Sequence, residues 1–140
     1  MEEKEIEQLI EQAFEARERS YCPYSEFAVG AALLIKTGKI YTGCNIENAA
    51  YTPTNCAERT AFFKAVSEGE TEFKAIAVVG GRKQSGAGEI GLCAPCGVCR
   101  QVMLEFCGKD FLIISASDKK CRRLCTLEEL APFGFGRDSL

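Results

Sequence analysis

The stretch from Thr54 to Arg59 reads TNCAER and combines a thiol, a carboxylate two positions later and an adjacent guanidinium. The chain contains no histidine, although histidine is the commonest metal ligand and the usual acid–base group near neutral pH. Catalysis by serine–histidine or cysteine–histidine pairs is therefore excluded, together with every metal site that uses imidazole. The chemistry of this chain must rest on cysteine, carboxylate, lysine, tyrosine or arginine side chains.

Two more thiols are spaced to bind a metal. Cys96 and Cys99 form a C-x-x-C motif directly after Pro95, at the start of a helix predicted over residues 96–107. Residues three apart share one helix face, so both thiols can reach one ion. Cys56 begins another predicted helix, where the partial positive charge of a helix N-terminus favours the thiolate. If the two helix starts face each other, three thiolates can hold zinc and leave its fourth position open for water, as in a catalytic site.

The neighbours of Cys56 fit such a site. Glu58 lies in the first turn of the predicted helix, where it can reach a zinc-activated water without binding the metal, take its proton and pass it on. Three thiolates on Zn²⁺ leave a net charge of about −1, which opposes the activation of water. Arg59 can offset this charge by hydrogen bonds to the sulfur atoms from outside the ligand set.

The combination of C-A-E with P-C-x-x-C resembles the signature of the zinc-dependent deaminases, with Cys56 in place of their histidine. The chain resembles the cytidine deaminase family in its short, homotetrameric form. The resemblance extends over most of the chain, through the segments PYSEFAVG (23–30), GCNIENAAY (43–51), CAERTAFFKAV (56–66), PCGVCRQV (95–102) and LEELAPFGF (127–135).

This resemblance implies a hydrolase of pyrimidine salvage that converts cytidine and 2′-deoxycytidine to uridine and 2′-deoxyuridine plus ammonia, using zinc-activated water. It implies one zinc per chain, held by Cys56, Cys96 and Cys99. Glu58 would activate the water and carry protons to N3 of the base and to the leaving ammonia, with Arg59 supporting the ligands.

The resemblance also implies how the substrate is held. The backbone N–H of Ala57 would bind the pyrimidine O2, Phe27 would stack on the base, and Asn45 and Glu47 would hold the ribose 3′-hydroxyl. Tyr51 and an aromatic residue of the tail would complete the pocket of a neighbouring subunit, which implies a homotetramer with shared active sites. We expect the tail residue to be Phe135, although Phe133 is an alternative.

Other interpretations stay open on the residues alone. Glu58 can belong to a capping box begun by Asn55. Cys96 and Cys99 can form a redox pair, and with Cys93 they imitate an iron–sulfur motif. Phe27 can be an ordinary core residue, and Asn45 with Glu47 can be turn residues. The remaining cysteines are predicted to be small, buried apolar residues: Cys22, Cys44, Cys107, Cys121 and Cys125.

Three alternative functions also remain. The chain can act on another amino-pyrimidine, as deaminases of the blasticidin S type do, or it can edit polynucleotides. It can instead be a non-enzymatic zinc module, closed by Cys93 as a fourth ligand. Cys93 is an extra cysteine relative to the expected pattern, and the Gly- and Ser-rich loop over residues 80–91 is longer than expected.

The composition limits the domain organisation, the partners and the location that the chain can have. The 140 residues, 46% hydrophobic and 26% charged, predict a single domain over residues 1–140. The net charge of −3 argues against a nucleic-acid partner. The acidic, amphipathic N-terminus does not resemble a signal peptide, and no apolar run approaches the ~20 residues of a membrane span. We therefore expect a cytoplasmic location and no membrane association.

Periodicity predicts the elements that must position these residues. Residues 4–19 carry a helical stripe of Ile6, Leu9, Ile10, Ala13, Phe14 and Arg17. Further helices are predicted over 55–68, 96–107 and, after a capping box of Thr126 and Glu129, before Pro132. Strands are predicted over 27–36, 39–45, 73–80, 111–116 and 121–126. The order predicts a three-layer α/β/α fold with a mixed five-stranded sheet, in which each strand–helix–strand stretch gives parallel neighbours.

Overall fold

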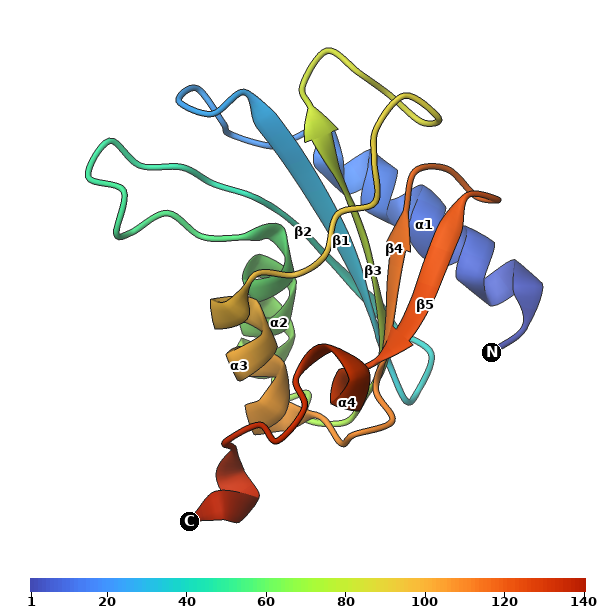
Figure 1. Cartoon of the computed structure of the whole chain (residues 1–140), viewed down its shortest axis with the longest axis vertical. Helices are drawn as coiled ribbons and strands as arrows, with labels where there is room; N and C mark the ends of the chain where they lie inside the picture. The colour runs from blue at the N-terminus through green and yellow to red at the C-terminus, as the bar shows by residue number, and fades with distance from the viewer.

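The computed structural model describes residues 1–140 and has a mixed five-stranded sheet between helices (Figure 1). The strand order is β2-β1-β3-β4-β5. β3 and β4 are parallel, and the other neighbouring pairs are antiparallel. The predicted fold class is confirmed. The strands are β1 (Phe27–Ile35), β2 (Ile40–Cys44), β3 (Phe73–Arg82), β4 (Leu112–Ala116) and β5 (Arg122–Thr126).

One predicted pairing is wrong. The stretch β2–α2–β3 does not join neighbouring strands, because β1 lies between β2 and β3. A continuous apolar strand is buried on both faces and favours the interior of a sheet. β1 is such a strand, and it takes β2 on one edge and β3 on the other, so the crossover has to pass over β1. The second predicted pair, β3 with β4, is parallel as expected.

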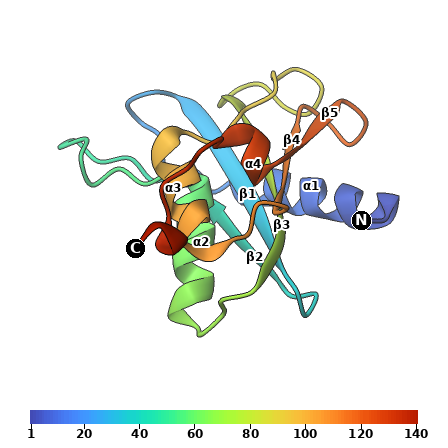
Figure 2. The ribbon, with the colours of Figure 1, turned by 60° about the horizontal axis from the view of Figure 1, so that its bottom comes forward.

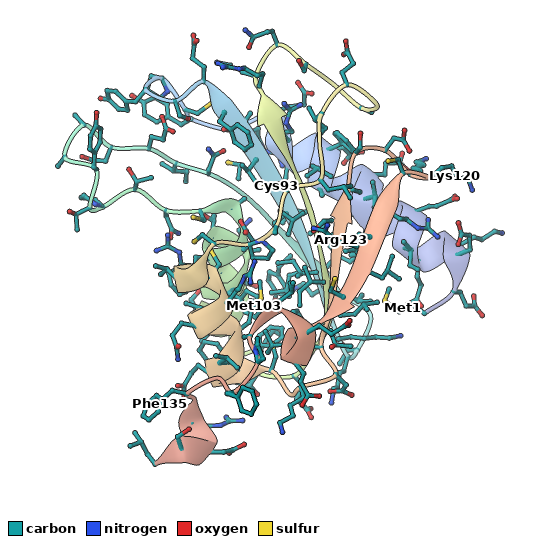
Figure 3. The ribbon with its side chains drawn as sticks, viewed as in Figure 1. Met1, Cys93, Met103, Lys120, Arg123 and Phe135 are labelled. Carbon is teal, nitrogen blue, oxygen red and sulfur yellow. The ribbon has the colours of Figure 1, made fainter.

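Helices cover both faces of the sheet (Figure 2). On one face lies α1 (Glu3–Arg17), and its predicted stripe packs on Ala32 and Leu34 of β1. On the other face lie α2 (Ala57–Ser67) and α3 (Gly97–Phe106), over the alternate β1 residues Ala31 and Leu33. Met103 of α3 is fully buried in this second core (Figure 3). No helix is long and apolar enough to cross a membrane.

The helix starts and ends differ slightly from the prediction. α2 begins at Ala57 with Cys56 as its N-cap. Asn55 pairs with Ile46 instead, through two backbone hydrogen bonds of 2.9 Å, so the alternative interpretation of Glu58 as part of a capping box begun by Asn55 is wrong. The capping box of Thr126 and Glu129 is confirmed at the start of α4 (Leu127–Leu130). A short 3-10 helix, Arg137–Ser139, ends the chain.

Candidate active site

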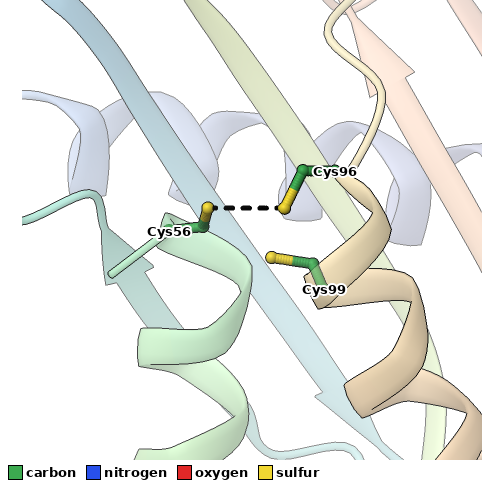
Figure 4. Close-up of side chains that lie close together, drawn as sticks. All are labelled: Cys56, Cys96 and Cys99. Atoms are coloured by element: carbon green, nitrogen blue, oxygen red, sulfur yellow. Dashed lines mark hydrogen bonds between the residues drawn. The ribbon is translucent and has the colours of Figure 1, made fainter. Parts of the chain in front are cut away.

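The N-cap residues of α2 and α3 are the cysteines Cys56 and Cys96, and their Sγ atoms lie 3.7 Å apart (Figure 4). Cys99 follows in the first turn of α3, and all three Sγ atoms lie within 4.8 Å of one another. Tetrahedral zinc with Zn–S bonds of about 2.3 Å would separate its sulfur ligands by about 3.8 Å. The three thiols are therefore spaced to hold a zinc ion.

The surroundings of the three thiols favour negative charge. Both N-cap cysteines stand where the free N–H groups of a helix start point outward. Hydrogen bonds from Cys99 and from the Arg59 guanidinium lower the pKa of Cys56. The bond between the two thiols raises the pKa of Cys99, because Cys99 keeps the proton that they share. Arg59 Nη2 donates to Cys56 Sγ at 3.2 Å. Arg59 Nε is buried without a partner, so the bond to Cys56 is the one side-chain hydrogen bond of this guanidinium.

Glu58 is the buried acid of the site. Only 4% of its surface is exposed. Burial raises its pKa to about 7, and the negative charge of Cys56 adds to the shift. A carboxyl group that titrates near neutral pH can both accept and donate a proton under physiological conditions. Its position in the first turn of α2 places this group beside the cysteines.

Cys93 does not join the cysteine group. Its Sγ packs against β3 at Gly80, where a Cβ would approach that sulfur to 2.9 Å. Burial raises the pKa of Cys93 to about 11. The close group contains three cysteines and no fourth protein ligand. This placement argues against a closed structural zinc site and for an open fourth position.

Asn45 holds the start of β1. Its Oδ1 accepts hydrogen bonds from the Val29 N–H at 2.9 Å and from the Ser20 hydroxyl, and its Nδ2 donates to the Phe27 carbonyl at 2.8 Å. The pairing of β2 with β1 ends at Cys44. Beyond that point the Asn45 side chain makes the hydrogen bonds to β1 that a paired strand would make. One N–H of the amide has no protein partner. Phe27 itself is 42% exposed, so it is not an ordinary core residue.

Glu47 is bound to the loop that precedes Phe27. Its carboxylate accepts from the backbone N–H groups of Tyr24 and Ser25, at 2.9 and 3.1 Å, and from the Ser25 hydroxyl. These bonds, that of the hydroxyl foremost, lower the pKa of Glu47. Ser25 Oγ also accepts from the Phe27 N–H at 3.0 Å. Ser25 thus connects the two predicted substrate residues, a role that the sequence did not indicate.

The two residues predicted to serve a neighbouring subunit are exposed. Tyr51 is 71% exposed, packs edge-on against Tyr24 and lines a cavity of about 330 Å³ with Glu47. Phe135 is 62% exposed and lies on the tail, whose backbone is held by the Gln101 side chain at 2.7 Å. Figure 3 shows it at the foot of α3, so it does not reach the cysteines of its own chain.

Two further cavities lie apart from the group of Cys56, Cys96 and Cys99. Phe27 and Cys93 line a cavity of about 330 Å³ at the end of β3. A cavity of about 680 Å³ lies between α1 and residues 118–120 and is lined mainly by charged side chains. The candidate site is therefore identified by its chemistry and not by cavity size.

A mixed sheet between helices that carries three cysteines able to hold one metal ion at two helix starts, with a buried glutamate beside them, defines the class of zinc-dependent hydrolytic enzymes. The family model described as the "Cytidine and deoxycytidylate deaminase zinc-binding region" matches residues 3–115. The cytidine deaminase of Sporosarcina psychrophila is 49% identical over 97% of this chain and 95% of its own length, and that of Halalkalibacterium halodurans is 47% identical over 94% and 95%. The crystal structure of cytidine deaminase from Burkholderia pseudomallei is 45% identical, with a TM-score of 0.81 over 91% of this chain and 97% of that chain. The chain belongs to the cytidine and deoxycytidylate deaminase family, and the predicted family resemblance is confirmed.

Proposed function

We propose that this chain catalyses the hydrolytic deamination of cytidine and 2′-deoxycytidine to uridine and 2′-deoxyuridine, with release of ammonia, in pyrimidine salvage. The observation that carries the proposal is the buried Glu58 carboxyl beside three thiols that leave one metal position open. Cys56, Cys96 and Cys99 would hold one zinc ion, which when bound lowers the pKa of a water molecule and polarises it for attack.

Glu58 moves the protons of the reaction. It takes one proton from the attacking water and delivers it to N3 of the pyrimidine while the water oxygen adds to C4. It then takes the second proton from the new C4 hydroxyl and transfers it to the exocyclic nitrogen, the C4–N bond breaks, the C4 carbonyl forms and ammonia leaves. The same carboxyl group is therefore protonated twice and deprotonated twice per turnover. A pKa of about 7 suits both steps.

The substrate contacts follow from groups that the fold leaves free. The Ala57 N–H belongs to the first turn of α2, where a helix has no internal partner for it, and it would donate to O2 of the base. The exposed Phe27 ring would stack on the base. The free N–H of Asn45 and the carboxylate of Glu47 would bind the ribose 3′-hydroxyl.

The active form that we propose is a cytoplasmic homotetramer of single-domain chains, each spanning residues 1–140, with no nucleic-acid partner. The support is the exposure of Tyr51 and Phe135, two aromatic side chains that a single chain leaves largely uncovered. In a tetramer these aromatic side chains would cover the nucleoside pockets of neighbouring subunits. The net charge of −3 disfavours a polynucleotide substrate.

The proposal is tested by incubating zinc-replete protein with cytidine, following the ultraviolet absorbance and identifying the product by chromatography. We expect stoichiometric uridine and ammonia with one zinc per chain. The same preparation is offered blasticidin S and single-stranded DNA as competing substrates. Turnover of either one in preference to cytidine, or bound zinc without any turnover, would refute the proposed substrate.

A further inference from the structure

Arg17 is the only charged side chain of α1 that is buried, with 5% of its surface exposed. It forms no ion pair within the chain. A buried charge is tolerated only when its polar atoms are satisfied. The guanidinium meets this condition with backbone carbonyls alone: Ala28 at 2.8 Å, Ser85 at 2.8 Å, Gly81 at 3.1 Å and Arg82 at 2.6 Å.

These carbonyls belong to the start of β1, to the end of β3, which pairs with it here, and to the loop that follows β3. The guanidinium binds all three segments at once. A close approach of α1 makes the contact possible. Gly30 of β1 lies directly beneath the helix, where a Cβ would come within 2.6 Å of the Arg17 backbone nitrogen. The last residue of α1 can therefore reach past the strand to the carbonyls beyond it.

In addition to its pairing with β3, the start of β1 is bound by two side chains. Asn45 binds the Phe27 carbonyl and the Val29 N–H. Arg17 binds the carbonyl of Ala28, the residue between them. Because successive carbonyls of a strand point to opposite sides, Asn45 binds the edge of β1 beyond the end of its β2 pairing, and Arg17 binds a carbonyl on the side that faces β3. This arrangement fixes the backbone from which the exposed Phe27 ring projects.

The loop after β3 is held by the same guanidinium. Its Ser85 carbonyl binds Arg17, and its Ile90 packs so closely on β3 that a Cβ at Gly81 would lie 2.7 Å from the Ile90 Cβ. The loop ends at Cys93, which lines one cavity together with Phe27. Arg17 thus fixes both sides of the cavity beside the stacking residue.

We propose that Arg17 is a positioning residue for nucleoside binding, which sets the Phe27 ring and the loop opposite it without touching the substrate. The inference rests on the proposed function, because it assumes that Phe27 stacks on the base. The cysteines and Glu58 lie on α2 and α3, across the sheet from α1, and Arg17 makes no hydrogen bond to them. Loss of Arg17 should therefore weaken substrate binding more than it slows the chemical steps.

The test compares Arg17→Gln and Arg17→Lys with wild type, and the exposed Arg19→Gln serves as the matched control. For each protein, zinc per chain, kcat and KM for cytidine and the inhibition constant of uridine are measured. Losing several hydrogen bonds from one charged group should raise KM and the uridine constant by about 10-fold or more for Arg17→Gln. We expect kcat within about threefold of wild type and one zinc per chain, partial recovery of KM in Arg17→Lys, and no change in Arg19→Gln.

A fall in kcat at unchanged KM, or loss of zinc in a folded Arg17 variant, would overturn the inference. If Arg17→Gln does not fold, Arg17→Lys decides the question by hydrogen exchange. Amides in residues 24–30 and 80–93 should exchange faster than in wild type while those of α3 do not change, and unchanged exchange in both segments would refute the positioning role. If wild-type protein with full zinc does not convert cytidine, the proposed function fails, and hydrogen exchange still tests what Arg17 holds.

Discussion

Replacing Glu58 by glutamine should affect activity and stability in opposite directions. Glutamine keeps the size of the side chain and cannot transfer protons. General acid–base catalysis contributes ~10²–10⁴-fold, and Glu58 serves two transfers, so we expect turnover to fall by at least ~10³-fold, or about 4 kcal/mol in the activation barrier. One zinc per chain should remain, because the carboxylate is not a ligand.

The stability effect follows from the buried charge. Burial raises the pKa of Glu58 from 4.5 to about 7 in the folded chain, so the folded state favours the protonated acid. The wild type therefore loses stability as pH rises from 4.5 to 7, by about 3 kcal/mol in total at 1.36 kcal/mol per pKa unit. Glutamine carries no charge and avoids this loss. The zinc-free variant should be more stable than zinc-free wild type at pH 8, and the difference should disappear near pH 4.5.

Both effects are measurable on the same two proteins. Cytidine turnover is compared at equal zinc content, and urea unfolding of the zinc-free forms is followed at pH 4.5, 6 and 8. Turnover of the Gln variant within tenfold of wild type would refute the role of Glu58 as proton carrier. Equal unfolding free energies at pH 8 would show that the Glu58 environment does not disfavour the charged form.

Three further changes test the ligands, the packing and the loop. Cys99→Ser should reduce bound zinc well below one per chain in metal analysis, and a variant that keeps full zinc would contradict the ligand assignment. Gly43→Ala should lower the unfolding free energy by ~1–3 kcal/mol, because a Cβ there would meet the Ala57 carbonyl at 2.5 Å; Gly97→Ala, which meets nothing within 4 Å, is the matched control in the same denaturation assay. Ser25→Ala should raise KM for cytidine by about 10-fold with little change in kcat, and an unchanged KM in steady-state kinetics would show that the link it forms is dispensable.

The metal site was predictable because its information is local. The spacing of Cys96 and Cys99 fixes their common helix face, and Cys56 and Glu58 share one helical turn. Only the meeting of the two helix starts needed the structure. The family resemblance predicted Asn45 and Glu47 to lie together at the ribose, and both contact the segment that leads into β1. What the resemblance does not show is that most of their hydrogen bonds go to the protein backbone.

Features that depend on distant parts of the chain were harder to predict. Pairing rules for strand–helix–strand units do not say that β3 would join the free edge of β1, so the neighbour of β2 was predicted wrongly. Arg17 stood out in the sequence only as a charged residue on an apolar helical stripe. Its four partners lie at Ala28 and beyond Gly80, and nothing in the pattern of α1 specifies them. Ser25 gave no signal beyond its place in a turn.

The central claim is that three thiols and one buried carboxyl form a zinc site that deaminates cytidine. The most direct measurement is ammonia release from cytidine by wild-type protein before and after zinc removal with a chelator, and again after one equivalent of zinc is restored. We predict that activity disappears with the metal, returns in proportion to zinc bound up to one per chain, and yields one ammonia for each uridine. Undiminished ammonia release from protein shown to be free of metal would contradict the account.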